Sequence, residues 1–237
     1  MKIRTHKQDS RLIVYDADRI EQPREQLFDP DYWRGRGAAT GEAPGRGSSL
    51  FIDAEFGPAV LRRYLRGGKA ALLSRDRYLF TGYQRARPVA EFRLLARLKG
   101  AGLPVPSPLG GLCERRGFFY TGSLLTRRIR GAMPLADRLS DPEVDEVLWR
   151  ETGACIRRFH DYGVVHADLN ARNILVGPPA EVSVIDFDRG RIAPGSQRAF
   201  ASNLERLRRS LEKLWAADRR ARLDTCWALL QQGYAGQ

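Results

Sequence analysis

The sequence predicts an α+β fold of two lobes, in which an antiparallel sheet with one helix comes first and a reduced, mostly helical lobe follows. Glycine-rich turns separate short apolar runs in the first half, a pattern typical of hairpins. One segment there, residues 89–98, has apolar residues at helical spacing instead. Long helical patterns dominate the second half. We therefore expect an N-terminal lobe over residues 1–126 and a C-terminal lobe over residues 127–237.

Turn residues delimit the elements of the first half. Asp29 before Pro30 predicts a helix cap with proline in the first turn. The residues before Asp29 carry mixed charge and are assigned no strand or helix. The helix over 89–98 is expected to stop at Gly100. Four strands are expected: one ending at Ile52, its hairpin partner 59–64, and two more near 109–114 and 117–126.

The second half is expected to contain helices on both sides of one hairpin. A short helix spans 135–139, and Asp141-Pro142 caps a longer one that ends near residues 160–163. Apolar runs at 174–176 and 182–185 predict the hairpin. Residues 202–232 predict one or two amphipathic helices. Their apolar face is expected to comprise Leu204, Leu207, Leu211, Leu214 and Trp215.

Composition limits the compartment and the partners. The chain of 237 residues is 43% hydrophobic, which fits a folded protein with a substantial core. Its three cysteines match no metal-ligand spacing and predict reduced thiols in a cytosolic protein. We expect no signal peptide and no membrane span, because no long apolar segment occurs. The net charge of +12 favours nucleic acid, an anionic lipid surface, or a phosphorylated or carboxylated substrate.

The residues around the hairpin point most clearly to chemistry. His166-Ala-Asp168-Leu-Asn-Ala-Arg-Asn173 precedes it, and Asp186-Phe-Asp188 follows its second strand. The hairpin is expected to return Asp186 beside the loop that contains Asp168 and Asn173. His166 is expected to pack this loop against the strand of Asp186.

These residue types suit phosphoryl transfer. The reaction needs an oriented hydroxyl group, Mg²⁺ on the phosphates and positive charge near the phosphate oxygens. We assign Asp168 as the catalytic residue that orients the acceptor hydroxyl and accepts its proton. Asn173 and Asp186 are assigned as the metal ligands, since Mg²⁺ prefers oxygen atoms.

The loop and the aspartate after the hairpin resemble the catalytic loop H-x-D-x-x-x-x-N and the metal-binding D-F-G of protein-kinase-like enzymes. The resemblance implies ATP as the phosphate donor and Mg²⁺ as the cofactor. Upstream, Gly45 and Gly47 resemble the kinase phosphate loop, although Leu50 replaces its third glycine. Arg62 stands where kinases have a strand lysine, and Glu91 matches the helix glutamate that pairs with it. The reserve candidates for the phosphate contact are Arg63 and Lys69.

The chain departs from protein kinases after the metal-binding aspartate. Asp188 replaces the glycine of D-F-G, which argues against a mobile metal loop. No A-P-E phrase follows, and the next helical segment begins soon after Asp186. A protein substrate needs a longer segment to lie on, whereas a small acceptor does not.

Longer phrases resemble 3-deoxy-D-manno-octulosonic acid (Kdo) kinases, from about residue 27 to residue 213. The most discriminating are residues 74–82, Ser-Arg-Asp-Arg-Tyr-Leu-Phe-Thr-Gly, and residues 186–191, Asp-Phe-Asp-Arg-Gly-Arg. The resemblance implies transfer of the ATP γ-phosphate to the 4-hydroxyl of a Kdo residue on Kdo-lipid A. It also implies a peripheral protein of lipopolysaccharide biosynthesis on the cytoplasmic face of a Gram-negative inner membrane. Arginine is usual at the Arg62 position in this family.

The charge of the chain fits this acceptor. A carboxylated, phosphorylated sugar lipid on an anionic inner-membrane surface suits a protein with a net charge of +12. Residues 65–87 form a basic insert where acceptor or headgroup contacts could form. The candidates for these contacts are Arg75, Arg77, Arg189 and Arg191; the alternative is that they are simply solvated charges.

Two other functions stay open. A different small-molecule kinase, for a heptose or an aminoglycoside, would share the same loop, although a cationic aminoglycoside suits an acidic site better. A non-catalytic, basic pseudokinase scaffold would be marked by loss of a base or metal ligand, and Asp168, Asn173 and Asp186 are all present. No nucleic-acid module accompanies the basic runs, so nucleic acid is not expected as a partner. The sequence specifies no oligomeric state.

Overall fold

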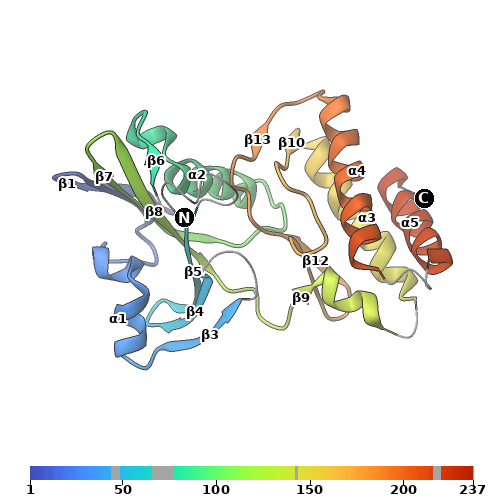
Figure 1. Ribbon diagram of the computed structural model, residues 1–237, viewed down its shortest axis with the longest axis horizontal. Coiled ribbons are helices and arrows are strands. Elements are labelled where there is room, and N and C mark those ends of the chain that lie inside the picture. The colour runs from blue at the N-terminus through green and yellow to red at the C-terminus, as the bar shows by residue number, and fades with distance from the viewer. Residues whose placement is uncertain (44–48, 66–76, 142–143, 216–219, 237) are drawn as a thin grey trace. The chain divides into compact units, whose positions relative to one another are not determined.

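The computed structural model describes residues 1–43, 49–65, 77–141, 144–215 and 220–236. They form two compact units (Figure 1). The first unit comprises Met1–Arg97 and Pro106–Arg128, and the second comprises Leu98–Val105 and Ile129–Gln237. An antiparallel sheet dominates the first unit and helices dominate the second, which confirms the predicted α+β class.

An eight-stranded antiparallel sheet forms the centre of the first unit. Its strands follow the order β1, β2, β7, β8, β5, β4 and β3, and β6 pairs with β8 outside this path (Figure 1). The strands are β1 (Ile3–Gln8), β2 (Arg11–Asp16), β3 (Ala39–Ala43), β4 (Ser49–Ala54), β5 (Gly57–Arg63), β6 (Tyr78–Leu79), β7 (Pro108–Arg116) and β8 (Phe119–Arg127). The four strands predicted from turn residues correspond to β4, β5, β7 and β8.

The start of the chain, which the sequence analysis left without elements, forms the hairpin β1–β2. β1 is exposed along its whole length, so no apolar alternation marks it as a strand. Residues 12–15 of β2 are buried without alternation, because both faces of the sheet are covered there. The backbone of β2 is paired with β1 on one edge and with β7 on the other.

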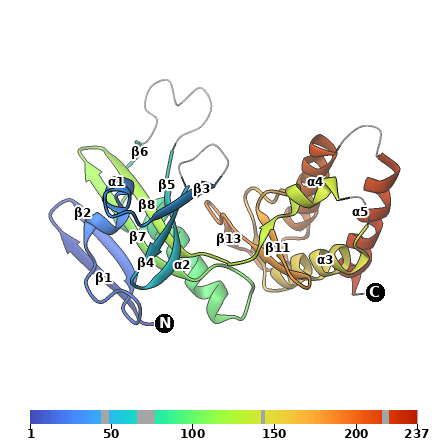
Figure 2. The same cartoon turned by 90° about the horizontal axis from the view of Figure 1, so that it is seen from below.

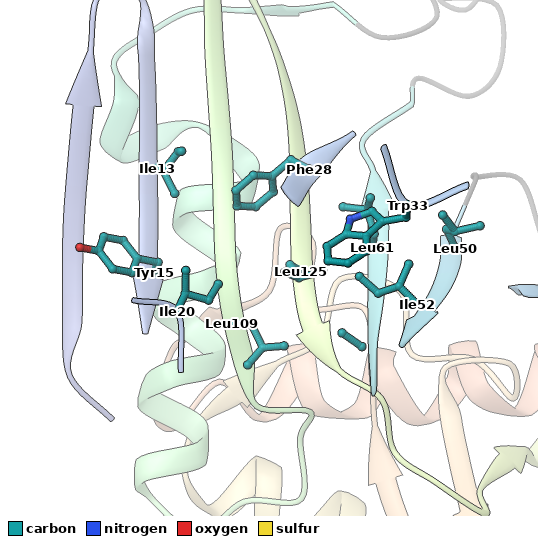
Figure 3. Packing of buried hydrophobic residues seen from close by; sticks show 11 residues of the cluster. Ile13, Tyr15, Ile20, Phe28, Trp33, Leu50, Ile52, Leu61, Leu109 and Leu125 are labelled. Atoms are coloured by element: carbon teal, nitrogen blue, oxygen red, sulfur yellow. The ribbon is translucent and has the colours of Figure 1, made fainter. Parts of the chain in front are cut away.

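Figure 3 shows the apolar cluster on one face of this sheet, where Phe28 and Trp33 lie among side chains from the strands. Phe28 ends the short 3-10 helix η1 (Glu25–Phe28), and Trp33 belongs to α1 (Pro30–Gly35). As predicted, Asp29 caps α1, since its carboxylate accepts the Asp31 N–H at 3.0 Å.

Two consecutive glycines in β7 let other elements approach both faces of the sheet. A Cβ atom on Gly110 would lie 2.9 Å from the Phe28 ring, whereas one on Gly111 would lie 2.8 Å from the Pro88 carbonyl oxygen. Successive residues of a strand face opposite sides. Phe28 therefore covers one face, and the start of α2 (Arg87–Gly100) covers the other. The predicted end of this helix at Gly100 is confirmed.

The second unit contains two small sheets, β12–β11–β9 and β10–β13, among its helices. The strands are β9 (Met133–Pro134), β10 (Val164–Val165), β11 (Ile174–Gly177), β12 (Glu181–Val184) and β13 (Arg191–Ile192). The helices are η4 (Leu135–Ser140), α3 (Glu146–Asp161), α4 (Gln197–Leu214) and α5 (Arg220–Ala235), and Figure 2 labels the last three. The antiparallel pair β11–β12 is the predicted hairpin. No helix among the described residues has the length and apolar character needed to cross a membrane.

Two helix predictions were wrong in detail. Asp145, not Asp141, caps α3, because its carboxylate accepts the Leu148 N–H of the first turn at 2.9 Å and the cap must directly precede the helix. Pro142 lies outside the described residues. In α4, Leu204 is only half-buried and Leu214 is 36% exposed. The buried face of α4 consists of Phe200, Asn203, Leu207 and Leu211.

Candidate active site

The predicted catalytic loop, residues 166–173, lies in the second unit between β10 and β11. The β11–β12 hairpin then returns the chain to this loop. The Ile185 N–H, one residue beyond β12, donates to the Asn173 carbonyl oxygen at 2.9 Å. Asp186 thus follows a residue that is hydrogen-bonded to the loop, as the hairpin predicts.

His166 connects the loop to the chain segment that carries Asp186. The Asp168 backbone N–H donates to His166 Nδ1 at 3.1 Å, and His166 Nε2 lies 3.0 Å from the Ile185 carbonyl oxygen. An amide N–H can only donate and a carbonyl can only accept, so the ring is neutral with its proton on Nε2. Burial lowers the pKa of His166, which favours this neutral form. The packing role predicted for His166 is confirmed.

Asn203 of α4 clamps the backbone of His166. Its Oδ1 atom accepts the His166 N–H at 3.0 Å, and its Nδ2 atom donates to the His166 carbonyl oxygen at 2.7 Å. The residue is 5% exposed, so water does not compete for these contacts. Asn203 was not among the predicted site residues. In the sequence, Asn203 can be noticed as a polar residue at an apolar position of a helical pattern, three positions after Phe200 and four before Leu207.

A second buried histidine lies near this clamp. His160, near the end of α3, is 2.8 Å from the Tyr234 hydroxyl and stacks on Phe200 with ring centroids 4.5 Å apart. Burial lowers the pKa of His160 to about 4, and a hydrogen bond with Asn203 opposes this only partly. His160, His166 and Asn203 line the same small pocket. Burial thus favours the neutral form of both histidines, of which His166 belongs to the predicted catalytic loop.

Asp168 presents its carboxylate at the surface of the loop, with 64% of its side chain exposed. Asn170 donates to one carboxylate oxygen at 3.1 Å, and Arg206 of α4 lies 3.7 Å from the other. These contacts, which the sequence analysis did not predict, orient the carboxylate without covering it. A general base must come within hydrogen-bond distance of the proton that it accepts. The exposure of Asp168 allows that approach.

A hydrogen bond constrains the first assigned metal ligand, Asn173, and an uncommon backbone conformation marks the second, Asp186. Asn173 Nδ2 donates to the Asp168 carbonyl oxygen at 2.9 Å, so the amide oxygen is the atom that can act as a ligand. Asp186 has a left-handed backbone with φ of 63°, which is uncommon for a residue with a side chain. Phe187, 1% exposed, packs against His166 and Phe159 and thereby anchors this turn.

The site provides few protein ligands for a metal ion. Among the residues that the structure describes, no group of three or more His, Cys, Asp or Glu side chains could hold one. Mg²⁺ is commonly bound through one or two carboxylates together with substrate phosphates and water, instead of a full protein cage. The amide of Asn173 and the carboxylate of Asp186 are the oxygen-bearing groups that would serve such a site.

The first unit contains the predicted pair of Arg62 and Glu91. Arg62 of β5 and Glu91 of α2 form an ion pair, with Nη2 of Arg62 2.5 Å from Oε2 of Glu91. The Tyr64 hydroxyl donates to the same oxygen at 2.5 Å and lies 3.2 Å from Arg62 Nη2. The Glu91 side chain is 2% exposed and that of Arg62 is 22% exposed. This arrangement anchors the Arg62 guanidinium while part of the side chain stays exposed. The contribution of Tyr64 was not predicted.

Other predicted contacts fall outside the described residues. Gly45, Gly47, Lys69 and Arg75 belong to this group. The first described residue after the two glycines is Ser49, which is the cross-strand partner of Arg62. Three of the arginines expected to contact the acceptor are exposed: Arg77 in the first unit and Arg189 and Arg191 in the second.

Known proteins similar to this chain include three named 3-deoxy-D-manno-octulosonic acid kinase. That of Stenotrophomonas maltophilia (strain R551-3) is 46% identical over 202 residues, which cover 85% of this chain and 80% of the relative. The relative from Xanthomonas euvesicatoria pv. vesicatoria (strain 85-10) is 44% identical over 222 residues, covering 94% and 88%. The relative from Xylella fastidiosa (strain 9a5c) is 44% identical over 202 residues, which cover 85% of this chain and 80% of the relative.

The family described as lipopolysaccharide kinase (Kdo/WaaP) matches residues 30–234, nearly the whole chain. The matched range includes the catalytic loop, the hairpin and the ion pair of Arg62 with Glu91. This agrees with the resemblance drawn from residues 74–82 and 186–191. The chain belongs to the lipopolysaccharide kinase (Kdo/WaaP) family.

Proposed function

We propose that the chain is a 3-deoxy-D-manno-octulosonic acid kinase that transfers the γ-phosphate of ATP to the 4-hydroxyl of a Kdo residue on Kdo-lipid A. Family membership supports the kinase activity, and the names of the relatives support the Kdo acceptor. One observation carries the mechanism: the exposed Asp168 carboxylate stands on a loop whose backbone is held by His166 and Asn203.

In this proposal Asp168 accepts a hydrogen bond from the acceptor hydroxyl and takes its proton as the new O–P bond forms. The bond from the γ-phosphorus to the bridging oxygen breaks, and ADP leaves. Arg206 and Asn170 hold the carboxylate in position. Asn173 and Asp186 would hold Mg²⁺, which when bound neutralises charge on the phosphate oxygens.

The nucleotide phosphates are assigned to the first unit. The Arg62 guanidinium, held by Glu91 and Tyr64, would contact phosphate oxygens by charge-assisted hydrogen bonds. Arginine suits this role because its planar fork matches phosphate geometry and it stays charged at every physiological pH. Gly45 and Gly47 are proposed to let the backbone approach the same phosphates.

The setting proposed for the enzyme is the cytoplasmic face of a Gram-negative inner membrane, to which it binds peripherally. The acceptor is a lipid in an anionic surface, and the net charge of +12 complements that surface. The exposed Arg189 and Arg191 follow Asp186 in the same unit as the catalytic loop and are candidates for the acceptor carboxylate.

The acceptor test offers the purified chain ATP, Mg²⁺ and, in separate reactions, Kdo-lipid A and a heptose-containing core saccharide. Phosphorus–proton correlation NMR of the product locates the phosphate. The proposal expects phosphate on the Kdo 4-hydroxyl and none on heptose. Phosphate on another Kdo hydroxyl would correct the position, whereas reaction with heptose alone would refute the Kdo assignment.

A further inference from the structure

The turn between β7 and β8 presents large apolar side chains to solvent. Phe118 is 80% exposed and Phe119, the next residue, is 42% exposed. Leu79 of β6, 61% exposed, is the direct cross-strand partner of Phe119. Figure 1 shows β6, β7 and β8 together in the sheet of the first unit. We call Leu79, Phe118 and Phe119 the apolar tip.

The fold itself does not require the apolar tip. Arg116 pairs with Phe119, so Gly117 and Phe118 form a two-residue hairpin turn, in which glycine and polar residues are usual. Gly117 supplies the positive φ of 62°. Phe118 contributes its carbonyl oxygen, which accepts the Phe80 N–H at 2.8 Å, and any side chain would leave that bond intact. The exposed Phe118 ring therefore adds little to the stability of the unit.

Basic residues flank the apolar tip along the chain. Arg77, Arg115 and Arg116 are exposed. Arg115 is held in place, since its Nε donates to the Gly117 carbonyl oxygen at 2.8 Å and its guanidinium lies 4.9 Å from the Phe80 ring centroid. Glu114, an acidic residue beside them, forms ion pairs with Arg11 at 3.1 Å and with Arg116 at 3.4 Å.

We propose that the apolar tip and its arginines form the surface by which this chain docks on an anionic phospholipid bilayer. Exposed aromatic and aliphatic side chains next to Arg are the composition of interfacial membrane-binding segments. Phe118 would enter the boundary between headgroups and acyl chains, while Arg115 and Arg116 contact lipid phosphates. The choice of a membrane over a protein partner rests on this charge and on the proposed function, which places the acceptor in a lipid surface.

The docking test measures co-flotation of the full chain with vesicles of phosphatidylethanolamine and phosphatidylglycerol, and separately with phosphatidylcholine vesicles. Phe118→Ser should weaken binding to the anionic vesicles about tenfold. Replacing Arg115 and Arg116 together by Gln should weaken it by a similar or larger factor and reduce its dependence on salt. Val147→Ser is the matched control, because Val147 is 61% exposed on α3 and lies outside the apolar tip.

A second measurement places the tip relative to the bilayer. Brominated lipids should quench the added fluorescence of Phe118→Trp, but not that of Val147→Trp. Failure of the native chain to bind anionic vesicles, or equal binding by Phe118→Ser, would overturn the docking proposal. If the chain binds anionic vesicles but does not phosphorylate Kdo-lipid A, the docking proposal stands and the proposed function is contradicted. Phe118→Ser is expected to keep full activity on a soluble Kdo saccharide, which separates docking from catalysis.

Discussion

Replacing Asn203 by alanine is predicted to slow phosphoryl transfer more than it weakens ATP binding. The change removes both hydrogen bonds that clamp the His166 backbone, at 3.0 and 2.7 Å. His166 in turn fixes the Asp168 N–H through Nδ1. Without the clamp the loop can shift, and a displacement of about 1 Å at a catalytic group can lower the rate by about 100-fold.

The burial of Asn203 and His166 determines how much Asn203→Ala lowers the stability of the fold. Asn203 and His166 are 5% and 4% exposed, so the freed N–H and carbonyl groups would be buried. Each unsatisfied buried group costs about 1–3 kcal/mol. Asn203→Ala should therefore lower the free energy of unfolding by about 2–5 kcal/mol, or the Tm by about 5–15 °C for a chain of this size.

The assay combines urea unfolding with steady-state kinetics on Kdo-lipid A, at a temperature where every variant is folded. Asn203→Asp keeps an acceptor for the His166 N–H but sets a carboxylate oxygen against the His166 carbonyl, so we expect intermediate or equal damage. Ser202→Ala, on the exposed side of α4, is the control and should change neither quantity. An unchanged kcat in Asn203→Ala would refute the reasoning, even if stability falls.

Three further predictions concern other parts of the chain. Arg62→Ala should lower the free energy of unfolding by about 2–3 kcal/mol, since it removes the guanidinium that lies 2.5 Å from the buried Glu91 carboxylate. The double variant Arg62→Met with Glu91→Leu should regain stability in urea unfolding but not ATP affinity, and regained affinity would contradict the phosphate role. The pKa of His160 is about 4 in the folded chain, below its usual 6.5. Between pH 4 and pH 6.5 the unfolded chain therefore binds more protons than the folded chain, so the free energy of unfolding falls as the pH drops, by up to about 1.4 kcal/mol per pH unit. His160→Gln should reduce this pH dependence of the free energy of unfolding, measured by urea titration. An unchanged pH dependence would exclude His160 as its source. Gly153→Ala should lower the free energy of unfolding of the second unit by about 1–3 kcal/mol, because a Cβ atom on residue 153 would lie 1.9 Å from the Leu230 carbonyl oxygen. An unchanged melting curve would contradict the contact between α3 and α5.

Much of the catalytic unit could be predicted because its signals are local in sequence. The spacing of Asp168, Asn173 and Asp186 and the apolar runs between them predict a loop, a hairpin and a returning carboxylate. The structure has that hairpin, with Ile185 bonded to Asn173. The roles of these residues as base and metal ligands stay predictions.

The missed residues act across long sequence separations. Asn203 reaches His166 from 37 positions away, and Tyr64 reaches Glu91 from 27 positions away. No periodicity or motif of one segment encodes such a partner. Asn203 interrupts an apolar helical stripe, and a buried polar residue needs a hydrogen-bond partner. The pattern therefore indicates that Asn203 has a partner, but not that the partner is His166.

Misassigned elements have a related cause. The exposed β1 has no apolar face of its own, and its pairing with β2 makes it a strand. The cap of α3 was placed at Asp141 because a following proline often marks a helix start. The hydrogen bond from the Leu148 N–H to Asp145 shows where the first turn begins.

The mass of Kdo-lipid A after incubation with ATP and Mg²⁺ tests the central claim most directly, with the native chain compared with Asp168→Asn. This isosteric change removes the carboxylate that accepts the proton. Asp31→Asn, whose side chain is 84% exposed in the first unit, serves as the control. We predict that the native chain and the control add one phosphate to the lipid, while Asp168→Asn adds almost none. Phosphorylation at the native rate by Asp168→Asn would contradict the mechanism, and no mass gain with the native chain would contradict the acceptor.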